Sequence, residues 1–193
     1  MYCLILSSVC GYAQTEDTII QEILDFRNEL NEHYSNKETS PLKKKERRKF
    51  KTHRFYPVDL KYRVSARVVL IENADTIVMP TSAGTAKNFI RFAELHFEIR
   101  DTSCVLIAYQ RAKEGHDNYL FIPFTDATSG NESYGGGRYI DLDMPVGDEV
   151  ILDFNKAYNP YCAYTTGWFC PIPPRENSLN IAIKAGLMAP EHH

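Results

Sequence analysis

From Tyr56 onward, hydrophobic and polar residues alternate with a period of two, which is typical of β-strands. Turn residues such as Asn73, Pro80 and Gly84 separate the alternating segments. Eight strands are predicted, over residues 62–71, 75–79, 89–100, 103–110, 118–124, 138–144, 149–154 and 179–186. Short strands at this spacing predict a mainly β fold, either an antiparallel sandwich or a partly closed barrel.

The N-terminal part follows a helical period instead. Thr15 has the character of an N-cap, and Glu16 and Asp17 would place acids in the first turn, where the helix dipole favours them. Apolar residues then recur every three or four positions and share one helical face: Ile19, Ile23, Phe26, Leu30 and Tyr34. We expect this helix to pack on the β domain, so that residues 14–55 and 56–193 form one globular unit.

A strongly basic run follows the helix. Residues 43–54 hold eight Lys and Arg against one acid, and Ser40 and Pro41 can begin a second short helix there. Such a run indicates either a patch for nucleic acid or a membrane surface, or a solvated helix face. The solvated face is favoured, because aromatic or groove-fitting partners are not evident and the net charge of the chain is −3. No nucleic-acid partner is therefore expected.

The first thirteen residues carry no charge and contain a short apolar run, Leu4 to Val9. With Gly11 and Ala13 behind it, this run resembles a secretory signal peptide over residues 1–13, cleaved before Gln14. No basic residue precedes the run, so a buried N-terminal strand is the alternative. The run is too short to cross a bilayer, which takes roughly 20 apolar residues. We expect a periplasmic or extracellular protein with no integral membrane segment.

Two cysteines lie in a proline-rich stretch, NPYCAYTTGWFCPIPPREN, over residues 159–177. Export would favour a Cys162–Cys170 disulfide, which would contribute about 2.5 kcal/mol by closing a short loop. A zinc knuckle lacks a second ligand pair. A cysteine nucleophile would need a histidine partner, which the fold could bring close but the sequence does not show. The stiffened loop would present Tyr158, Tyr161, Tyr164 and Trp168, either to bind something or to cap the core. Cys104 lies in an apolar strand and is expected in the core.

Three other patterns have possible chemistry. The glycine turn in SYGGGRY, residues 133–139, lacks a phosphate-loop ending, but it could be a structural turn or an anion-holding nest completed by Arg138. Glu94, His96 and Glu98 alternate on one strand face, which is more typical of a solvent-facing sheet than of a metal site. Asp141 and Asp143 share a face and are an acid–base pair only if the fold brings them into one cleft. No metal or cofactor is expected.

The order of the motifs FYPVDLKYRVSA, FIPFTDATSGNESYGGGRYIDL, DFNKAYNPYCAY and CPIPPRENSLNIAIKAG resembles the domain-of-unknown-function 1684 family of bacterial and archaeal proteins. The resemblance covers about residues 40–186 and implies no activity. It implies that segments 124–141 and 153–177 are what the family is built around, and it leaves a reduced Cys162–Cys170 pair as an alternative to the disulfide.

These segments contain the candidate ligand-binding residues: Asp126, Ser129, Glu132, Tyr134, Gly136, Arg138, Asp153, Asn155, Tyr158, Asn159, Glu176 and Asn177. The favoured hypothesis is an exported β-rich domain that binds an unidentified small polar or anionic molecule beside the glycine turn and the Pro/Cys loop. The alternatives are a cell-envelope hydrolase with Arg138, Asp153 and Cys162 in its pocket, and a purely structural envelope protein. The sequence decides neither catalysis nor oligomeric state.

Overall fold

The structure is a computed structural model that describes residues 15–112 and 119–191, so the predicted signal peptide lies outside the described residues. Two α-helices precede the strands: α1 (Glu16–Ser35) and α2 (Lys44–Arg47). The strands are β1 (Arg63–Leu70), β2 (Thr76–Pro80), β3 (Ala86–Ile99), β4 (Thr102–Arg111), β5 (Tyr119–Phe124), β6 (Arg138–Asp143) and β7 (Glu149–Asp153). The predicted mainly β fold with an N-terminal helix is confirmed.

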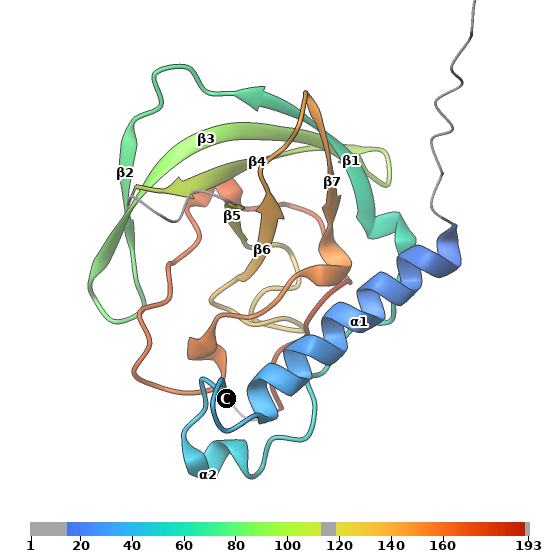
Figure 1. Cartoon of the computed structure of the whole chain (residues 1–193). Helices are drawn as coiled ribbons and strands as arrows, with labels where there is room; N and C mark the ends of the chain where they lie inside the picture. The colour runs from blue at the N-terminus through green and yellow to red at the C-terminus, as the bar shows by residue number, and fades with distance from the viewer. Residues whose placement is uncertain (1–14, 113–118, 192–193) are drawn as a thin grey trace, which may run out of the picture.

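All seven strands belong to one antiparallel sheet with the order β6-β5-β4-β3-β1-β7, and β2 pairs with β3 outside this path. The sheet is curled into a half-barrel (Figure 1). Strands at both ends contribute to one apolar core, since Ile140 of β6 and Leu152 of β7 belong to the same buried cluster. Curling therefore buries the concave face without closing the barrel.

A β-bulge in β3 divides the sheet into two packing regions. Before the bulge Arg91 pairs with Tyr109, and after it Ala93 pairs with Ala108, so one extra residue reverses the side-chain alternation. Phe89 consequently belongs to a second buried cluster, whereas Leu95 belongs to the main core. The second cluster lies on the opposite face of β4 and β5, and it also contains Tyr109, Phe121 and Tyr139.

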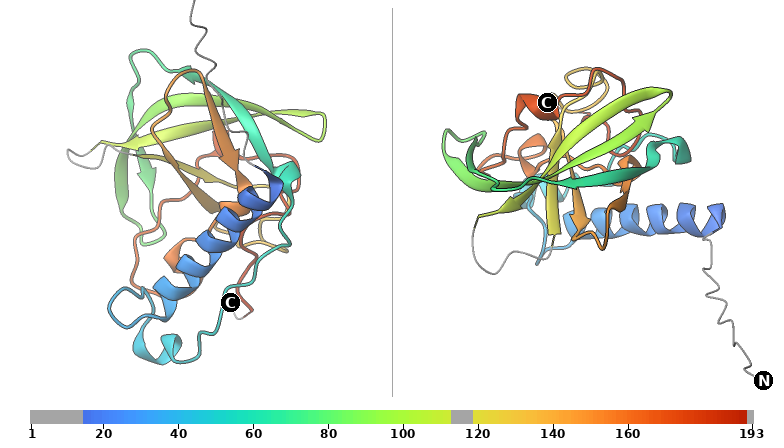
Figure 2. Two further views of the ribbon diagram at one scale, coloured as in Figure 1. Left: turned by 45° about the vertical axis from the view of Figure 1, so that its right-hand side comes forward. Right: turned by 90° about the horizontal axis from the view of Figure 1, so that it is seen from above.

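Helix α1 runs along one side of the molecule beside the sheet (Figure 2). Its N-cap is Thr15, whose side chain accepts a hydrogen bond from the Thr18 amide, as the sequence predicts. Ile23 and Tyr34 are buried on the expected face. Arg27 is buried there too, with its guanidinium 4.6 Å from the centre of the Phe55 ring. The apolar pattern could not predict Arg27, because the contact depends on a ring from another segment.

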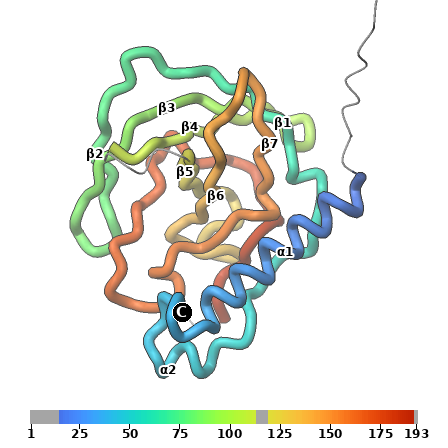
Figure 3. Tube along the Cα trace, viewed as in Figure 1, coloured from blue at the N-terminus to red at the C-terminus, as the bar shows by residue number. Residues whose placement is uncertain are grey.

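The prediction of an eighth strand over residues 179–186 is wrong. Leu179, Ile183 and Ala185 are buried in this stretch and Ile181 is half-buried, which is the alternation of a strand. Its backbone, however, forms only isolated bonds, such as those to the segment after β5, from the Leu179 amide to the Thr125 carbonyl and from the Ala127 amide to the Ile181 carbonyl. It passes behind α1 in the view of Figure 3. The carbonyls of Ile183 and Ala185 bind a side chain instead.

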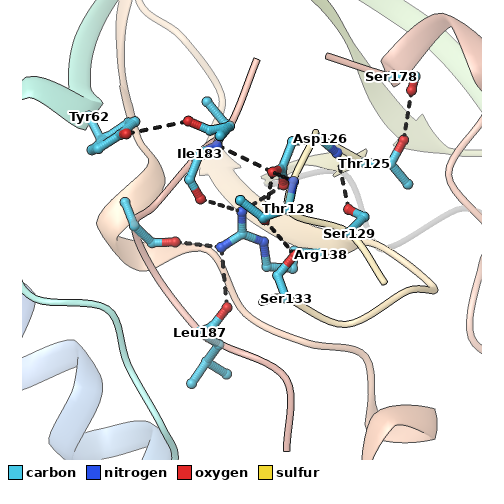
Figure 4. Close-up of polar contacts among 12 residues, drawn as sticks. Tyr62, Thr125, Asp126, Thr128, Ser129, Ser133, Arg138, Ser178, Ile183 and Leu187 are labelled. Carbon is cyan, nitrogen blue, oxygen red and sulfur yellow. Dashed lines mark hydrogen bonds and ion pairs between the residues drawn. The ribbon is translucent and has the colours of Figure 1, made fainter. Parts of the chain in front are cut away.

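That side chain is Arg138, which has no exposed surface. Its guanidinium donates to the carbonyls of Ala185, Leu187 (3.2 Å) and Ile183 (2.8 Å), and it forms an ion pair with Asp126 at 2.7 Å (Figure 4). A fork of N–H donors can satisfy several carbonyls of an extended chain at once. Arg138 therefore anchors the C-terminal stretch to β6.

The row of Glu94, His96 and Glu98 lies on the solvent-facing side of β3, as expected. His96 contacts Glu94 at 2.8 Å, and Arg67 of β1 lies directly opposite His96 in the strand register. Within residues 15–112 and 119–191, no group of three His, Cys, Asp or Glu side chains could hold a metal ion. None of the helices in that part of the chain is long and apolar enough to cross a membrane.

Candidate functional site

A cavity with a volume of about 620 Å³ lies over the second buried cluster. Its floor is one face of strands β3 to β6, and its wall is the stretch of residues 158–171, here called the Cys loop. Sixteen residues line it: Thr85, Ala86, Lys87, Phe89, Arg111, Tyr119, Phe121, Tyr139, Asp141, Tyr158, Pro160, Tyr161, Trp168, Phe169, Cys170 and Pro171. A volume of a few hundred Å³ or more is typical of small-molecule sites.

The floor depends on the bulge in β3. Lys87 and Phe89 precede the bulge and face the cavity, whereas Leu95 beyond it faces the main core. Without the extra residue, Lys87 and Phe89 would point to the other side of the sheet, because a shift of one residue reverses every side chain. The bulge therefore places a cation and an aromatic ring at the site.

The Cys loop is closed by the predicted Cys162–Cys170 disulfide, whose Cα atoms lie 6.3 Å apart. The loop is also tied to the edge of the sheet: the Ser82 hydroxyl accepts from the Cys170 amide, and the Ile172 amide donates to the Pro80 carbonyl at 2.8 Å. Trp168 and Phe169 are 40% and 52% exposed, so they extend the apolar wall to the mouth of the cavity.

The two N-terminal helices and the segment between them contact the Cys loop. The rings of Tyr34 and Tyr164 lie 5.1 Å apart in an edge-to-face arrangement, and His33 contacts the Tyr161 hydroxyl at 3.2 Å. The Thr165 hydroxyl donates to Glu46 of α2 at 2.7 Å, and the Trp168 indole donates to the Pro41 carbonyl, between the two helices, at 3.2 Å. Tyr161 and Trp168 thus face the cavity, while Tyr164 packs on α1. The loop aromatics therefore divide between the cavity lining and the contact with α1.

Two cations, Lys87 and Arg111, line the cavity together. Desolvation by burial lowers the pKa of the Lys87 amine, and the nearby positive charge of Arg111 lowers it further. Among the described residues, neither side chain forms an ion pair with a carboxylate. The cavity therefore contains two cations that have no direct carboxylate partner among the described residues.

An acid lies on the same floor. The Tyr158 hydroxyl donates a hydrogen bond to Asp141 Oδ2 at 2.7 Å. Asp141 is open to solvent, yet protein atoms crowd it, and this desolvation raises the pKa of its carboxyl group, while the bond from Tyr158 opposes the rise. Burial, followed by the charge of Asp141, raises the pKa of Tyr158 well above its ordinary value. Tyr158 is consequently a neutral hydrogen-bond donor near neutral pH.

Of the twelve candidate ligand-binding residues, Tyr158 is the one that lines this cavity. Arg138 and Asp126 are fully buried with each other as partners. Asp153 binds Arg63 at 3.4 Å, and Asn155 holds the backbone of Asp59. These four side chains stabilise the fold around the main core.

The remaining candidates also bind protein groups. The Asn177 side chain bonds to both backbone groups of Ile107 and to the Pro123 carbonyl; Asn159 bonds to the Met188 carbonyl and the Tyr164 hydroxyl; Glu176 binds Arg91 at 2.7 Å and the Tyr109 hydroxyl. Ser129 accepts from the Asp126 amide, and Glu132 pairs with Lys184 at 2.8 Å. Tyr134 and Gly136 lie together in the glycine turn, where the Tyr134 ring covers Gly136.

The glycine turn and the proline-rich segment lie side by side, as predicted, where Gly137 meets Pro173. A Cβ atom on Gly137 would lie 2.6 Å from the Pro173 ring and 2.7 Å from the Phe124 carbonyl oxygen, and its φ of +85° also favours glycine. The turn does not, however, contribute to the rim of the cavity described above, which comes from the Cys loop. The close approach of two backbones explains the glycine better than an anion nest does.

Sequence reasoning did not single out Lys87, Arg111 or Tyr119. They lie near the ends of three different strands, and the sheet register brings them together. Asp141 was considered only as a partner of Asp143, but Asp143 does not line the cavity.

A sequence model of the family described as "Protein of unknown function (DUF1684)" matches residues 48–188. A solved structure is also similar: the solution NMR structure of an uncharacterized protein from gene locus rrnAC0354 of Haloarcula marismortui. It is 34% identical with a TM-score of 0.71, and the match covers 92% of this chain and 97% of that one. The comparison with curated proteins gave no match.

Proposed function

This chain belongs to the DUF1684 family, and we propose that it is a binding protein whose cavity holds a small anionic molecule. One observation carries the proposal: Lys87 and Arg111 share the cavity, and no carboxylate among the described residues pairs with either. Two neighbouring cations repel each other, and an anion bound between them would relieve that repulsion. An arginine fork and a lysine ammonium are the usual partners of phosphate and carboxylate groups.

The aromatic lining supports binding of a ligand that also has an apolar or planar part. Phe89 and Phe121 are stacked 5.5 Å apart on the floor, and Trp168 and Phe169 stand at the mouth. Rings on rigid supports contribute contact area at low entropic cost. The disulfide and the contacts with α1 and α2 hold this wall in place before a ligand arrives.

A hydrolase that uses Arg138, Asp153 and Cys162 has less support. Arg138 and Asp153 are buried with protein partners, and Cys162 is bonded to Cys170. A nucleophile or general acid must reach a substrate. These three side chains do not share an open cavity, so binding is the better proposal.

Export is part of the proposal. The Cys162–Cys170 disulfide supports it, because disulfides persist mainly in oxidising compartments. Mass spectrometry of protein purified from its native host should find Gln14 at the N-terminus. Protein that retains residues 1–13 and stays in the cytosol would contradict export and leave the cavity proposal standing.

Ligand binding can be followed through Trp168, the single tryptophan of the chain and part of the cavity wall. We expect phosphate, sulfate or a small carboxylate to change its fluorescence in a saturable way. Lys87→Met and Arg111→Met should each weaken binding by about tenfold or more, since hydrogen bonds to charged groups contribute about 1.5–3 kcal/mol.

Lys45→Met is the matched control, because Lys45 is an exposed cation on α2. It should leave the affinity unchanged. If Lys45→Met weakens binding as much as Lys87→Met does, the anion is attracted to the basic surface rather than to the cavity. If no anion in the panel gives a saturable signal, the proposal fails.

A further inference from the structure

We propose that the cavity contains a second subsite, at Asp141, for an organic ammonium group. The ligand would then be a small zwitterion, with its ammonium at Asp141 and its anionic group at Lys87 and Arg111. The inference rests on the proposed function for the anionic end only. The ammonium subsite is argued from the carboxylate and the rings that surround it.

Aromatic rings form a continuous series on the β6 side of the cavity. Tyr139 contacts Phe121 with centroids 4.7 Å apart and Tyr158 with centroids 5.8 Å apart, both edge to face. On the wall, Tyr161 and Trp168 lie 4.7 Å apart. Ring faces attract cations electrostatically, and cages of several rings are the usual recognition site of methylated ammonium groups.

Asp141 supplies the negative charge that such a cage needs. It lies directly opposite Phe121 in the strand register, and the Tyr158 hydroxyl binds its Oδ2 atom. No cationic side chain in the described part of the chain forms an ion pair with Asp141. The Asp141 carboxylate is open to the cavity, lies among aromatic rings and has one neutral hydrogen-bond donor. A cation that binds beside it would stabilise its charge. Desolvation raises the pKa of Asp141, as expected for a carboxylate that no neighbouring cation stabilises.

The two subsites are separated by β5. Arg111 is on β4 and Asp141 on β6, and both charges act on Tyr119 of β5, where Asp141 raises the pKa of the phenol and Arg111 lowers it. Arg111 is level with Tyr119 and Asp143 in the strand register, and Asp141 lies two residues further along β6. With strands about 4.8 Å apart and a rise of about 3.4 Å per residue, the two Cα positions lie roughly 12 Å apart. Both side chains extend into the cavity, which leaves room for a ligand whose charges are joined by a short linker.

A metal cation fits this subsite less well. Among the described residues that line the cavity, Asp141 alone has a carboxylate, and a hydrated divalent ion needs several oxygen ligands. An ammonium group with attached carbons needs one carboxylate and apolar ring faces, both of which are present. The lining therefore favours an organic cation.

The test compares two esters of equal shape through Trp168 fluorescence. Phosphocholine carries a phosphate and a quaternary ammonium, and 3,3-dimethylbutyl phosphate replaces the charged nitrogen by carbon. We expect phosphocholine to bind at least about tenfold more tightly, which corresponds to about 1.4 kcal/mol of cation–π and charge attraction. Asp141→Asn should remove most of this ratio without weakening the binding of inorganic phosphate, because it takes a negative charge out of the cavity. Asp143→Asn, on the same strand face outside the cavity lining, should change neither.

The outcomes separate the two proposals. Equal affinity for the two esters, with inorganic phosphate still bound, overturns the ammonium subsite and leaves the anion site standing. Saturable binding of tetramethylammonium without any binding of phosphate supports the subsite and contradicts the proposed function. A phosphocholine preference that survives Asp141→Asn and disappears in Asp143→Asn also overturns the assignment to Asp141.

Discussion

Arg138 and Asp126 form an ion pair at 2.7 Å in which neither side chain has solvent-exposed surface. The same guanidinium holds three carbonyls of the C-terminal stretch. Arg138→Ala would leave a buried carboxylate without its counter-charge, so we expect it to lower the free energy of unfolding by about 3–5 kcal/mol. Urea denaturation measures this loss. Arg175→Ala, at an exposed arginine, should stay within about 0.5 kcal/mol of the wild type. Equal stability of the two variants would rule out a structural role for Arg138.

Two adjacent residues of α1 test how the helix packs. Ile23 has no exposed surface, whereas Leu24 is 39% exposed. Ile23→Ala should therefore cost about 2–5 kcal/mol through lost burial and the cavity left behind. Leu24→Ala removes an equally large side chain and should cost far less. Thermal melting of both variants checks the orientation, and a larger loss for Leu24→Ala would mean that the other face of α1 is the packed one.

The disulfide should matter to the cavity as well as to stability. Replacing both Cys162 and Cys170 by serine should lower the free energy of unfolding by about 2.5 kcal/mol, the estimate for closing a loop of this length. We expect a weaker affinity for anions too, because the wall becomes less ordered. A reducing agent should have the same effects on the wild type and none on the double variant. If reduction leaves the melting temperature of the wild type unchanged, the disulfide does not stabilise the fold.

The burial of His53 predicts that acid lowers the stability of the protein. His53 is 5% exposed and lies among the rings of Tyr34, Phe50, Phe55 and Tyr164. Burial, assisted by the charge of His33, lowers the pKa of His53 to about 4. The folded-state pKa of His53 lies below the unfolded value of about 6.5. The free energy of unfolding that depends on a neutral His53 is therefore fully present above pH ~6.5 and is lost as the pH drops toward about 4.

NMR titration of the His53 ring, together with unfolding measured between pH 7.5 and 4.5, tests this prediction. His96→Gln alters a half-exposed histidine on the solvent-facing side of the sheet and should keep the acid sensitivity of the wild type. A His53 ring that titrates near 6.5 would contradict the burial argument.

Local patterns in the sequence predicted most of the fold. The period of α1, the N-cap at Thr15 and seven of the strands follow from residues close together in the chain. The eighth strand failed because alternation reports burial on one side and says nothing of what the backbone bonds to. Residues 183–187 alternate like a strand, but the carbonyls of Ile183, Ala185 and Leu187 bind Arg138.

The site was harder to predict for a related reason. Polar residues near glycine and proline, such as Asp126 and Asn177, suggested a pocket, and the structure places them in buried hydrogen-bond networks. The cavity instead depends on the bulge in β3, which reverses the direction of Lys87, and on the register that brings Arg111 and Asp141 onto one floor. No local pattern reports a bulge or a register.

The central claim is that an anion binds at Lys87 and Arg111. The basic run at residues 43–54 is the strongest competing site, so the most direct measurement is an NMR titration of isotope-labelled protein with phosphate. The account predicts saturable shift changes for Lys87, Arg111, Tyr119 and the Trp168 indole, at concentrations where residues 43–54 hardly move. Shifts confined to residues 43–54, with the cavity signals unchanged, would contradict it.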